Sequence, residues 1–321
     1  MIIVTGGAGF IGSNLIRKLN KLNKEEIIIV DNLNNANKLN NINDLSFLDF
    51  IDKKDFISNL EKGLFSNTDT IFHQGACSST TELDGTYLMK NNYEYSKKLL
   101  HFCLDNTIQF IYASSASVYG LGCKNFEEKF LNESPANLYA FSKFQFDQYV
   151  RKTAKGSKSQ VVGLRYFNVY GPREKHKLTM ASTAFHFYNQ ILENGFCKLF
   201  KGTDGYKNGT QARDFVYVDD CVDVNLWFHK NIESSGIFNV GTGNAKTFND
   251  MAKNILCWFK EKKNINAFIE YIEFPTNLKN KYQSFTQANI EKLKSIGYEK
   301  DFVNLKKGVY KYLDYLNENK I

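Results

Sequence analysis

Short hydrophobic runs alternate with amphipathic stretches through the first half of the chain. Short apolar runs are typical of buried strands, whereas apolar residues spaced three and four apart are typical of helices. We expect strands at 2–4, 27–30, 70–73, 110–112 and 161–164, helices at 10–20 and 139–150, and a further helical pattern through Leu99 and Leu104. This alternation predicts an α/β fold with a doubly wound parallel sheet of the Rossmann type.

The pattern loosens after Arg165. Glycines punctuate loops there, and residues 204–212 form a polar excursion. Strand character returns at 215–218 and 236–240, and residues 301–321 have a helical pattern. We therefore expect two interleaved parts. The larger comprises residues 1–167 and 214–241, and a smaller α/β lobe comprises residues 168–213 and 242–321.

Composition narrows the class of protein. The 321 residues are 43% hydrophobic, which is ample for a packed core. Lysine and arginine exceed the acidic residues by 41 to 34, giving a formal net charge of +7. These basic residues are scattered among asparagines and isoleucines and form no dense cluster. We therefore expect no nucleic-acid partner.

Cysteine spacing and hydropathy add three expectations. The six cysteines at 77, 103, 123, 197, 221 and 257 include no Cys-x-x-Cys pair, so we expect reduced thiols and no metal site. No apolar run approaches the ~20 residues that span a bilayer. The first strand begins at Ile2 and leaves no room for a signal peptide. We expect a soluble cytoplasmic protein without a membrane segment.

A glycine-rich turn, Thr5-Gly6-Gly7-Ala8-Gly9-Phe10-Ile11-Gly12, joins the first strand to the first helix. Gly6 permits a tight turn, Gly9 lets the backbone approach a pyrophosphate at the helix N-terminus, and Gly12 lets helix and strand pack closely. Because the strand–turn–helix context is met, the turn predicts dinucleotide binding. The larger part is then the dinucleotide-binding domain, and the smaller lobe binds substrate.

The residues after the second strand leave the choice of dinucleotide open. Asp31 lies about 20 residues beyond the turn, where a carboxylate bonds the adenosine ribose and favours NAD. Asn32, Lys38 and Lys53 are placed to hold a 2′-phosphate instead, or to be ordinary surface residues.

A catalytic set follows in the sequence. Tyr139 and Lys143 are four residues apart on a predicted helix and project from one face. A nearby ammonium is expected to lower the tyrosine pKa from about 10. Ser114-Ser115 stands at the carboxyl end of the strand expected at 110–112. The Ser115 hydroxyl is expected to bond the reacting substrate oxygen.

Together these motifs resemble the extended short-chain dehydrogenase/reductase superfamily. The resemblance also covers residues 114–120, 213–218 and 238–241. Sugar-nucleotide dehydratases of that superfamily place an Asp-Glu pair after the strand-end residue, but this chain has Ala116-Ser117. We therefore exclude dehydration. Residues 73–82 and 165–177, with the shorter Lys281-Tyr282-Gln283, resemble the ADP-glycero-manno-heptose 6-epimerase family of lipopolysaccharide assembly.

The resemblance implies a mechanism with two bases. Bound NADP would oxidise one secondary alcohol of an ADP-heptose to a ketone and return the hydride to the opposite face. Tyr139 matches the first acid/base and Lys177 the second, with His176 as a competing candidate. A homo-oligomer is also implied.

The resemblance further implies two sets of contacts. The expected NADP contacts are Gly6, Gly9, Phe10, Ile11, Gly12, Asp31, Asn32, Lys38, Lys53, Gln74, Gly75, Ala76, Cys77, Ser78, Asn91, Lys143, Val169 and Lys177. The expected substrate contacts are Asn168, Thr179, His186, Phe200, Lys201, Gly202, Thr203, Arg213 and Tyr282. Two departures stand out: Gln74 occupies a position where a glutamate is expected, and residues 204–212 are longer than the family pattern.

Two alternatives stay open. A UDP-hexose 4-epimerase shares the serine, tyrosine and lysine but gives no reason for Lys177. A noncatalytic NADP-binding regulatory protein can lose the catalytic groups, yet Ser115, Tyr139 and Lys143 are all present here.

Overall fold

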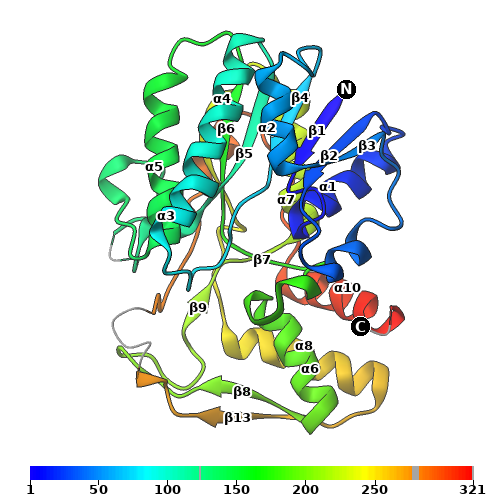
Figure 1. Cartoon of the computed structure of the whole chain (residues 1–321). Helices are drawn as coiled ribbons and strands as arrows, with labels where there is room; N and C mark the ends of the chain where they lie inside the picture. The colour runs from blue at the N-terminus through cyan, green and yellow to red at the C-terminus, as the bar shows by residue number, and fades with distance from the viewer. Residues whose placement is uncertain (123, 277–281, 320–321) are drawn as a thin grey trace.

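A parallel β-sheet forms the centre of the computed structural model, which describes residues 1–122, 124–276 and 282–319 (Figure 1). Among these residues the sheet has seven strands, in the order β11 (Gly236–Val240), β6 (Val161–Tyr166), β5 (Gln109–Ser115), β4 (Thr70–His73), β1 (Ile2–Thr5), β2 (Ile27–Asp31) and β3 (Asp49–Asp52). Every pairing in it is parallel. The strand order changes direction between β1 and β4, so the predicted doubly wound Rossmann-type fold is confirmed.

Helices cover both faces of this sheet. One face carries α1 (Phe10–Lys21) and α7 (Val218–Lys230), and the other carries α2 (Lys53–Glu61), α4 (Tyr95–Asp105) and α5 (Leu138–Thr153). Ile2 and Val4 of β1 pack in the core on the first face, whereas Ile3 packs in the core on the second. Side chains alternate along a strand, so a strand buried on both faces needs an unbroken apolar run.

A third hydrophobic core lies outside the sheet, in the lower lobe of Figure 1. Its helices are α6 (Thr183–Asn194), α8 (Phe248–Lys263) and α10 (Leu305–Glu318). Small strand pairs join them, namely β7 (Asn168–Tyr170) with β10 (Phe215–Tyr217), β9 (Ala212–Arg213) with β12 (Lys246–Thr247), and β8 (Phe196–Phe200) with β13 (Phe268–Ile272). Trp258 of α8 is fully buried in this core. The segments come from separate parts of the chain, as the predicted interleaving requires.

Short helices complete the chain. They are η1 (Ala36–Asn41), α3 (Gly85–Leu88), η2 (Met89–Glu94), η3 (Ala116–Tyr119), η4 (Phe130–Asn132), η5 (Lys175–Met180) and α9 (Glu291–Ser295). Cys123 lies outside the described residues, and the other five cysteines are free thiols. No helix of the described ranges combines the length and hydrophobicity needed to cross a bilayer.

Several boundaries differ from expectation, and the expected strands do not include β3, β7, β8, β9, β12 and β13. The strand predicted at 215–218 ends at Tyr217, because Val218 begins α7. The C-terminal helix begins at Leu305 rather than Asp301. Strand β3 was not predicted. It lies at the sheet edge and is only partly buried, so its sequence Asp-Phe-Ile-Asp carries no continuous apolar run.

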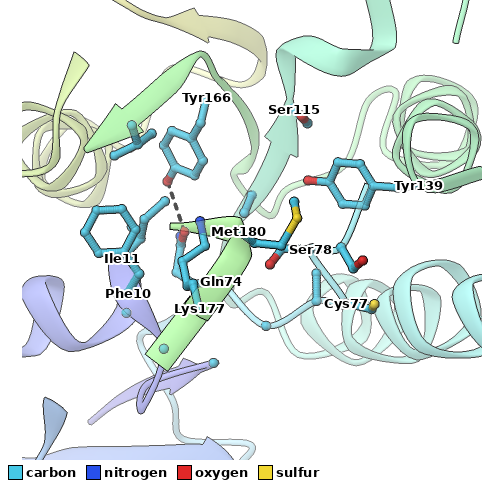
Figure 2. Close-up of a pocket in the computed structure, with 18 of the residues that line it drawn as sticks. Phe10, Ile11, Gln74, Cys77, Ser78, Ser115, Tyr139, Tyr166, Lys177 and Met180 are labelled. Atoms are coloured by element: carbon cyan, nitrogen blue, oxygen red, sulfur yellow. Dashed lines mark hydrogen bonds between the residues drawn. The ribbon is translucent and has the colours of Figure 1, made fainter. Parts of the chain in front are cut away.

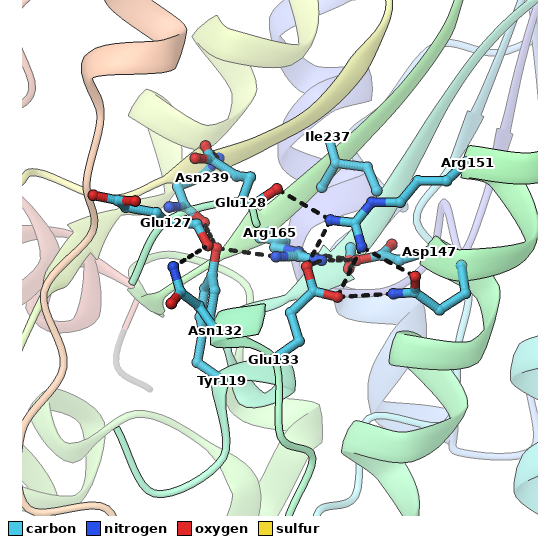
Figure 3. A network of polar contacts seen from close by, with 12 residues as sticks. Tyr119, Glu127, Glu128, Asn132, Glu133, Asp147, Arg151, Arg165, Ile237 and Asn239 are labelled. Carbon is cyan, nitrogen blue, oxygen red and sulfur yellow. Dashed lines mark hydrogen bonds and ion pairs between the residues drawn. The ribbon is translucent and has the colours of Figure 1, made fainter. Parts of the chain in front are cut away.

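A buried cation ties the sheet to α5 (Figure 3). The Arg165 side chain on β6 is fully buried. Its guanidinium donates to Asp147 of α5 at 2.8 and 2.9 Å, to Glu133 at 2.6 Å and to the Tyr119 hydroxyl at 3.0 Å. Arg151 adds a second guanidinium on Glu133, at 2.6 Å. Burial opposes ionisation of Glu133, but hydrogen bonds from Arg151 and the charge of Arg165 outweigh it and lower the pKa of Glu133.

Replacing Arg165 tests this network. Arg165→Met leaves Asp147 buried without its cation and Glu133 with Arg151 alone, so we expect the free energy of unfolding to fall by about 3–5 kcal/mol. Urea denaturation followed by circular dichroism measures the loss. As a control, Lys98→Met removes only an exposed pair with Glu61 and is expected to cost less than about 1 kcal/mol. Equal losses in the two variants would contradict the assignment.

Candidate active site

The glycine turn has the geometry that the sequence predicts. Gly6 has a φ of +70°, which residues other than glycine rarely adopt. A Cβ atom on Gly6 would lie 2.5 Å from the backbone nitrogen of Gly75, and one on Gly12 would lie 2.3 Å from the Gly6 carbonyl oxygen. The turn therefore packs backbone against backbone at the carboxyl end of β1. That leaves the first amides of α1 open for an anion.

A cavity of about 860 Å³ opens beside this turn (Figure 2). It lies over the carboxyl ends of the strands, at the switch point between β1 and β4. Every residue that the sequence assigned to the dinucleotide lines it, from Gly6 to Lys177. So do Ser115, Tyr139 and Asn168. The fold thus brings together at one site residues that are up to 171 positions apart.

Positive charge gathers at the end of β2. The Asp31 carboxylate accepts the backbone N–H of Ala8 at 2.9 Å and forms an ion pair with Lys38 at 2.8 Å. The Lys53 ammonium donates to Asn91 at 2.6 Å. Burial lowers the pKa of Lys53; Asp31 opposes this shift, and the charge of Lys38 adds to it. Because Asp31 is already paired, this corner of the cavity presents two ammonium groups and one neutralised carboxylate.

Tyr139 and Lys143 begin the helix α5. The Asn137 side chain caps its N-terminus by accepting the N–H of Ala140 at 2.8 Å. Figure 2 shows the Tyr139 phenol directed toward Ser115 at the end of β5. The Lys143 ammonium is buried and donates to the carbonyl of Ala113 at 2.8 Å. The three groups meet because α5 packs on β5, with its first turn at the carboxyl end of that strand.

The pKa of Tyr139 departs from the expected direction. Burial raises it, and the hydrogen-bonding influence of Ser115 lowers it only in part. The expectation that the pKa of Tyr139 falls below its usual value is wrong for this structure, because burial outweighs the lowering influence of Ser115. Burial also lowers the pKa of Lys143 to about 8, against the opposing charge of Asp147.

Lys177 enters the cavity from η5 (Figure 2). Its ammonium lies 5.4 Å from the centre of the Phe10 ring. Burial lowers the pKa of Lys177, and the nearby Glu174 carboxylate offsets part of that shift. His176 also lines the cavity, and burial with the charges of Lys38 and Lys177 lowers its pKa to about 4. An imidazole with that pKa is a weak base, whereas Lys177 is shifted toward the neutral form that a base requires.

Three of the expected substrate contacts form a separate cluster. The guanidinium of Arg213 stacks 4.8 Å from the centre of the Tyr282 ring, and the Phe200 ring lies 6.4 Å from that ring. Arg213 is buried, and no carboxylate among the described residues pairs with it. The structural salt bridge that would explain Arg213 without a ligand is thus missing from the described part of the chain. Lys281, the first residue of the Lys281-Tyr282-Gln283 match, lies outside it.

The other expected substrate contacts are more scattered. Asn168 lines the cavity. Thr179 is exposed on η5, and its carbonyl lies 3.3 Å from Nε2 of His186 on α6. Within the segment 200–203, the exposed Lys201 forms an ion pair with Glu273, and the N–H of Gly202 donates to Asn208 at 3.0 Å. The polar excursion at 204–212 therefore folds back on this segment.

Several cavity residues were not predicted. Tyr166 lies on β6, and its hydroxyl donates to Gln74 at 3.1 Å while accepting from Asn225 at 2.8 Å (Figure 2). Gln74 in turn donates to Asn225 at 3.0 Å, so an uncharged amide completes a closed ring of hydrogen bonds. Ser182 and Thr286 also line the cavity. Ser182 and Thr286 come from outside the recognised motifs, and only the tertiary fold brings them to the cavity.

Comparisons with known proteins identify the family. Residues 2–241 match the NAD dependent epimerase/dehydratase family. The chain is 52% identical to the ADP-L-glycero-D-manno-heptose-6-epimerase of Brachyspira hyodysenteriae, over 99% of this chain and 98% of that protein. It is 51% identical to the enzyme of the same name from Alkalilimnicola ehrlichii, over 98% and 97%. The crystal structure of the Helicobacter pylori ADP-L-glycero-D-manno-heptose-6-epimerase superposes with a TM-score of 0.83 at 33% identity, covering 98% of this chain and 96% of that one. The chain therefore belongs to the NAD dependent epimerase/dehydratase family and, within it, to the family of ADP-L-glycero-D-manno-heptose-6-epimerases.

Proposed function

We propose that this chain is an NADP-dependent epimerase that inverts carbon 6″ of ADP-glycero-manno-heptose. One observation carries the proposal: Tyr139 and Lys177, from different elements, both project into the cavity that begins at the glycine turn. Inversion requires an alcohol proton to be handled in two substrate orientations, and two separate acid/base groups meet that requirement. Membership of the family supports the choice of substrate.

The cavity fits a dinucleotide. The close backbone approach at Gly6 and Gly12 leaves space where a pyrophosphate can reach the amides of α1. Lys38 and Lys53 converge on the corner beside Asp31, and their charges suit a 2′-phosphate. These two lysines support NADP over NAD. The remaining expected contacts, among them Gly75 to Ser78 and Val169, line the same cavity as this corner and Tyr139.

The chain's own residues handle the protons. When bound, the nicotinamide supplies a reversible hydride acceptor for carbon 6″. In one substrate orientation the base, Tyr139 or Lys177, takes the hydroxyl proton as the C–H bond breaks, leaving a ketone. After the ketone presents its other face, the second residue donates a proton to the oxygen as the C–H bond re-forms. Ser115 would bond the reacting oxygen. Lys143, which donates to the Ala113 carbonyl, would also bond the cofactor ribose.

The lobe around α6 and α8 is proposed to bind the ADP-heptose. Arg213 supports this role, because a buried guanidinium without a carboxylate partner among the described residues suits a diphosphate. The Arg213 guanidinium lies over the Tyr282 ring and over the Phe248 ring. These two contacts hold the guanidinium in a fixed orientation. Lobe boundaries at 167/168, 213/214 and 241/242 remain part of this proposal. Assembly into a homo-oligomer, a cytoplasmic location and a place in lipopolysaccharide assembly stay predictions.

Both alternatives to this function explain less. A UDP-hexose 4-epimerase leaves Lys177 without a role in the cavity. A regulatory NADP-binding protein has no need for Ser115, Tyr139 and Lys143 to be assembled around one point. Incubating the protein with each ADP-heptose epimer in turn, with NADP added, and following carbon 6″ by NMR tests all three. No interconversion from either side would overturn the proposed function.

The choice of cofactor can be tested at the two lysines. We expect Lys38→Ala and Lys53→Ala each to weaken NADP binding by about 10-fold or more, because each removes a charge-assisted hydrogen bond worth roughly 1.5–3 kcal/mol. NAD binding, measured in parallel by calorimetry, is expected to change by less than about 3-fold. Parallel losses for both dinucleotides would contradict a 2′-phosphate site.

The two-base prediction is tested by Tyr139→Phe and Lys177→Met. Each is expected to slow epimerisation by about 100-fold or more, the usual contribution of a positioned acid or base. A base acts in its deprotonated form, so the wild-type kcat/KM for the epimer whose hydroxyl Lys177 deprotonates is expected to rise with pH through the lowered pKa of this lysine. If His176 were the base, the rise would lie near pH 4 instead. A pH profile measured for each epimer separates the two candidates.

A further inference from the structure

Residues 173–178, the segment that carries Lys177, have a backbone conformation that needs support from other parts of the chain. Leu178 has a φ of +50° and Arg173 a φ of +72°, and both lie in the left-handed region that is unfavourable for residues with a side chain. Such conformations persist only where contacts from elsewhere over-determine them. Lys177 lies between these two residues, so its position depends on those contacts.

Asn41 supplies one of those contacts. This buried residue ends η1, and its side-chain nitrogen lies 3.0 Å from the Ala8 carbonyl oxygen and 2.9 Å from Nδ1 of His176. The carbonyl of Ala8 can only accept, so the amide nitrogen must face it. The second N–H then points at the imidazole, and Nδ1 of His176 must be an unprotonated acceptor.

Three more hydrogen bonds join the same two segments. The Asn35 side chain donates to the His176 carbonyl at 3.0 Å. The Arg173 guanidinium donates to the backbone carbonyl of Asn41 and to Asp44, the latter at 2.5 Å. Arg173 and His176, which both precede Lys177, are therefore fastened to residues 35–44. Those residues continue directly from Asp31 and Asn32 at the dinucleotide corner.

The contacts of Asn41 also reach the glycine turn. Ala8, which accepts from Asn41, donates its own N–H to Asp31 at 2.9 Å, and Asp31 pairs with Lys38. A continuous path of polar contacts thus runs from the turn and the Lys38 corner through Asn41 to His176, the residue before Lys177. We propose that Asn41 and His176 are positioning residues that fix the Lys177 ammonium relative to the dinucleotide-binding turn. This inference rests on the proposed role of Lys177 as a base.

The role of His176 follows from the same geometry. Its ring lines the cavity but is held by Asn41 through Nδ1. The lowered pKa keeps it an acceptor at neutral pH, which agrees with the direction of the Asn41 hydrogen bond. His176 therefore acts through Lys177 instead of taking a proton from substrate. A displacement of about 1 Å at a reacting group can cost on the order of 100-fold in rate, so the loss of one such contact is measurable.

A double-mutant cycle tests the proposal. Asn41→Leu removes both donors at similar volume, and His176→Phe removes the acceptor while keeping a ring. Each change is made in the wild-type chain and in Lys177→Met, and kcat is measured by NMR at saturating NADP and ADP-heptose. The matched control is Asn40→Leu, because Asn40 is the exposed neighbour of Asn41.

We expect Asn41→Leu and His176→Phe each to lower kcat by about 10-fold or more when Lys177 is present, and by less than about 2-fold in the Lys177→Met background. Asn40→Leu is expected to leave kcat within about 2-fold in both. A purely structural role would slow both backgrounds equally, and that result overturns the inference. If one variant does not fold, the other still decides. Failure of the proposed function is distinct, since the wild type would not epimerise or Lys177→Met would keep its turnover.

Discussion

The burial of one arginine constrains much of this structure. The Arg165 guanidinium is shut off from solvent on β6, where an unpaired charge would be too costly to keep. Its counterions come from α5 and from the loop before it, so those segments must pack where Asp147 and Glu133 can reach it. Asp147 lies on the same helix as Tyr139 and Lys143. The requirement to neutralise a buried charge thereby fixes the orientation of the helix that carries Tyr139, the proposed acid/base.

The two neighbouring serines at the end of β5 have different roles, because one belongs to the buried network and the other faces the cavity. Successive residues of a strand face opposite ways. Ser114 donates to Asp147 at 2.9 Å and belongs to the buried network, whereas Ser115 is directed toward the Tyr139 phenol. One residue thus supports the helix and the next serves the cavity. A shift of one position in the strand register would exchange these roles and separate Ser115 from Tyr139.

Charge is distributed unevenly around the cavity. Lys38 and Lys53 gather near Asp31 at the end of β2, while Lys143 and Lys177 line the cavity from α5 and η5. Burial lowers the pKa of Lys53, Lys143 and Lys177, because each cation loses hydration without gaining a full counterion. An anionic ligand would stabilise the charged form of these lysines, which burial destabilises. These lysines therefore suit the proposed roles, Lys38 and Lys53 as partners of a phosphate and Lys177 as a base.

The sequence by itself determined the elements that depend on local chemistry. Unbroken apolar runs marked the buried strands, the glycines marked the turn, and the four-residue spacing placed Tyr139 and Lys143 on one helix face. The resemblance carried by residues 165–177 pointed to Lys177. Only the tertiary structure showed that Arg165 requires Glu133 and Asp147, that burial raises the pKa of Tyr139, and that Asn41 holds His176. Asn41 and His176 are 135 positions apart, and a contact between such distant polar residues leaves no periodic pattern in the sequence. Burial and hydrogen-bond partners come into being when distant segments pack, so they are properties of the folded chain alone.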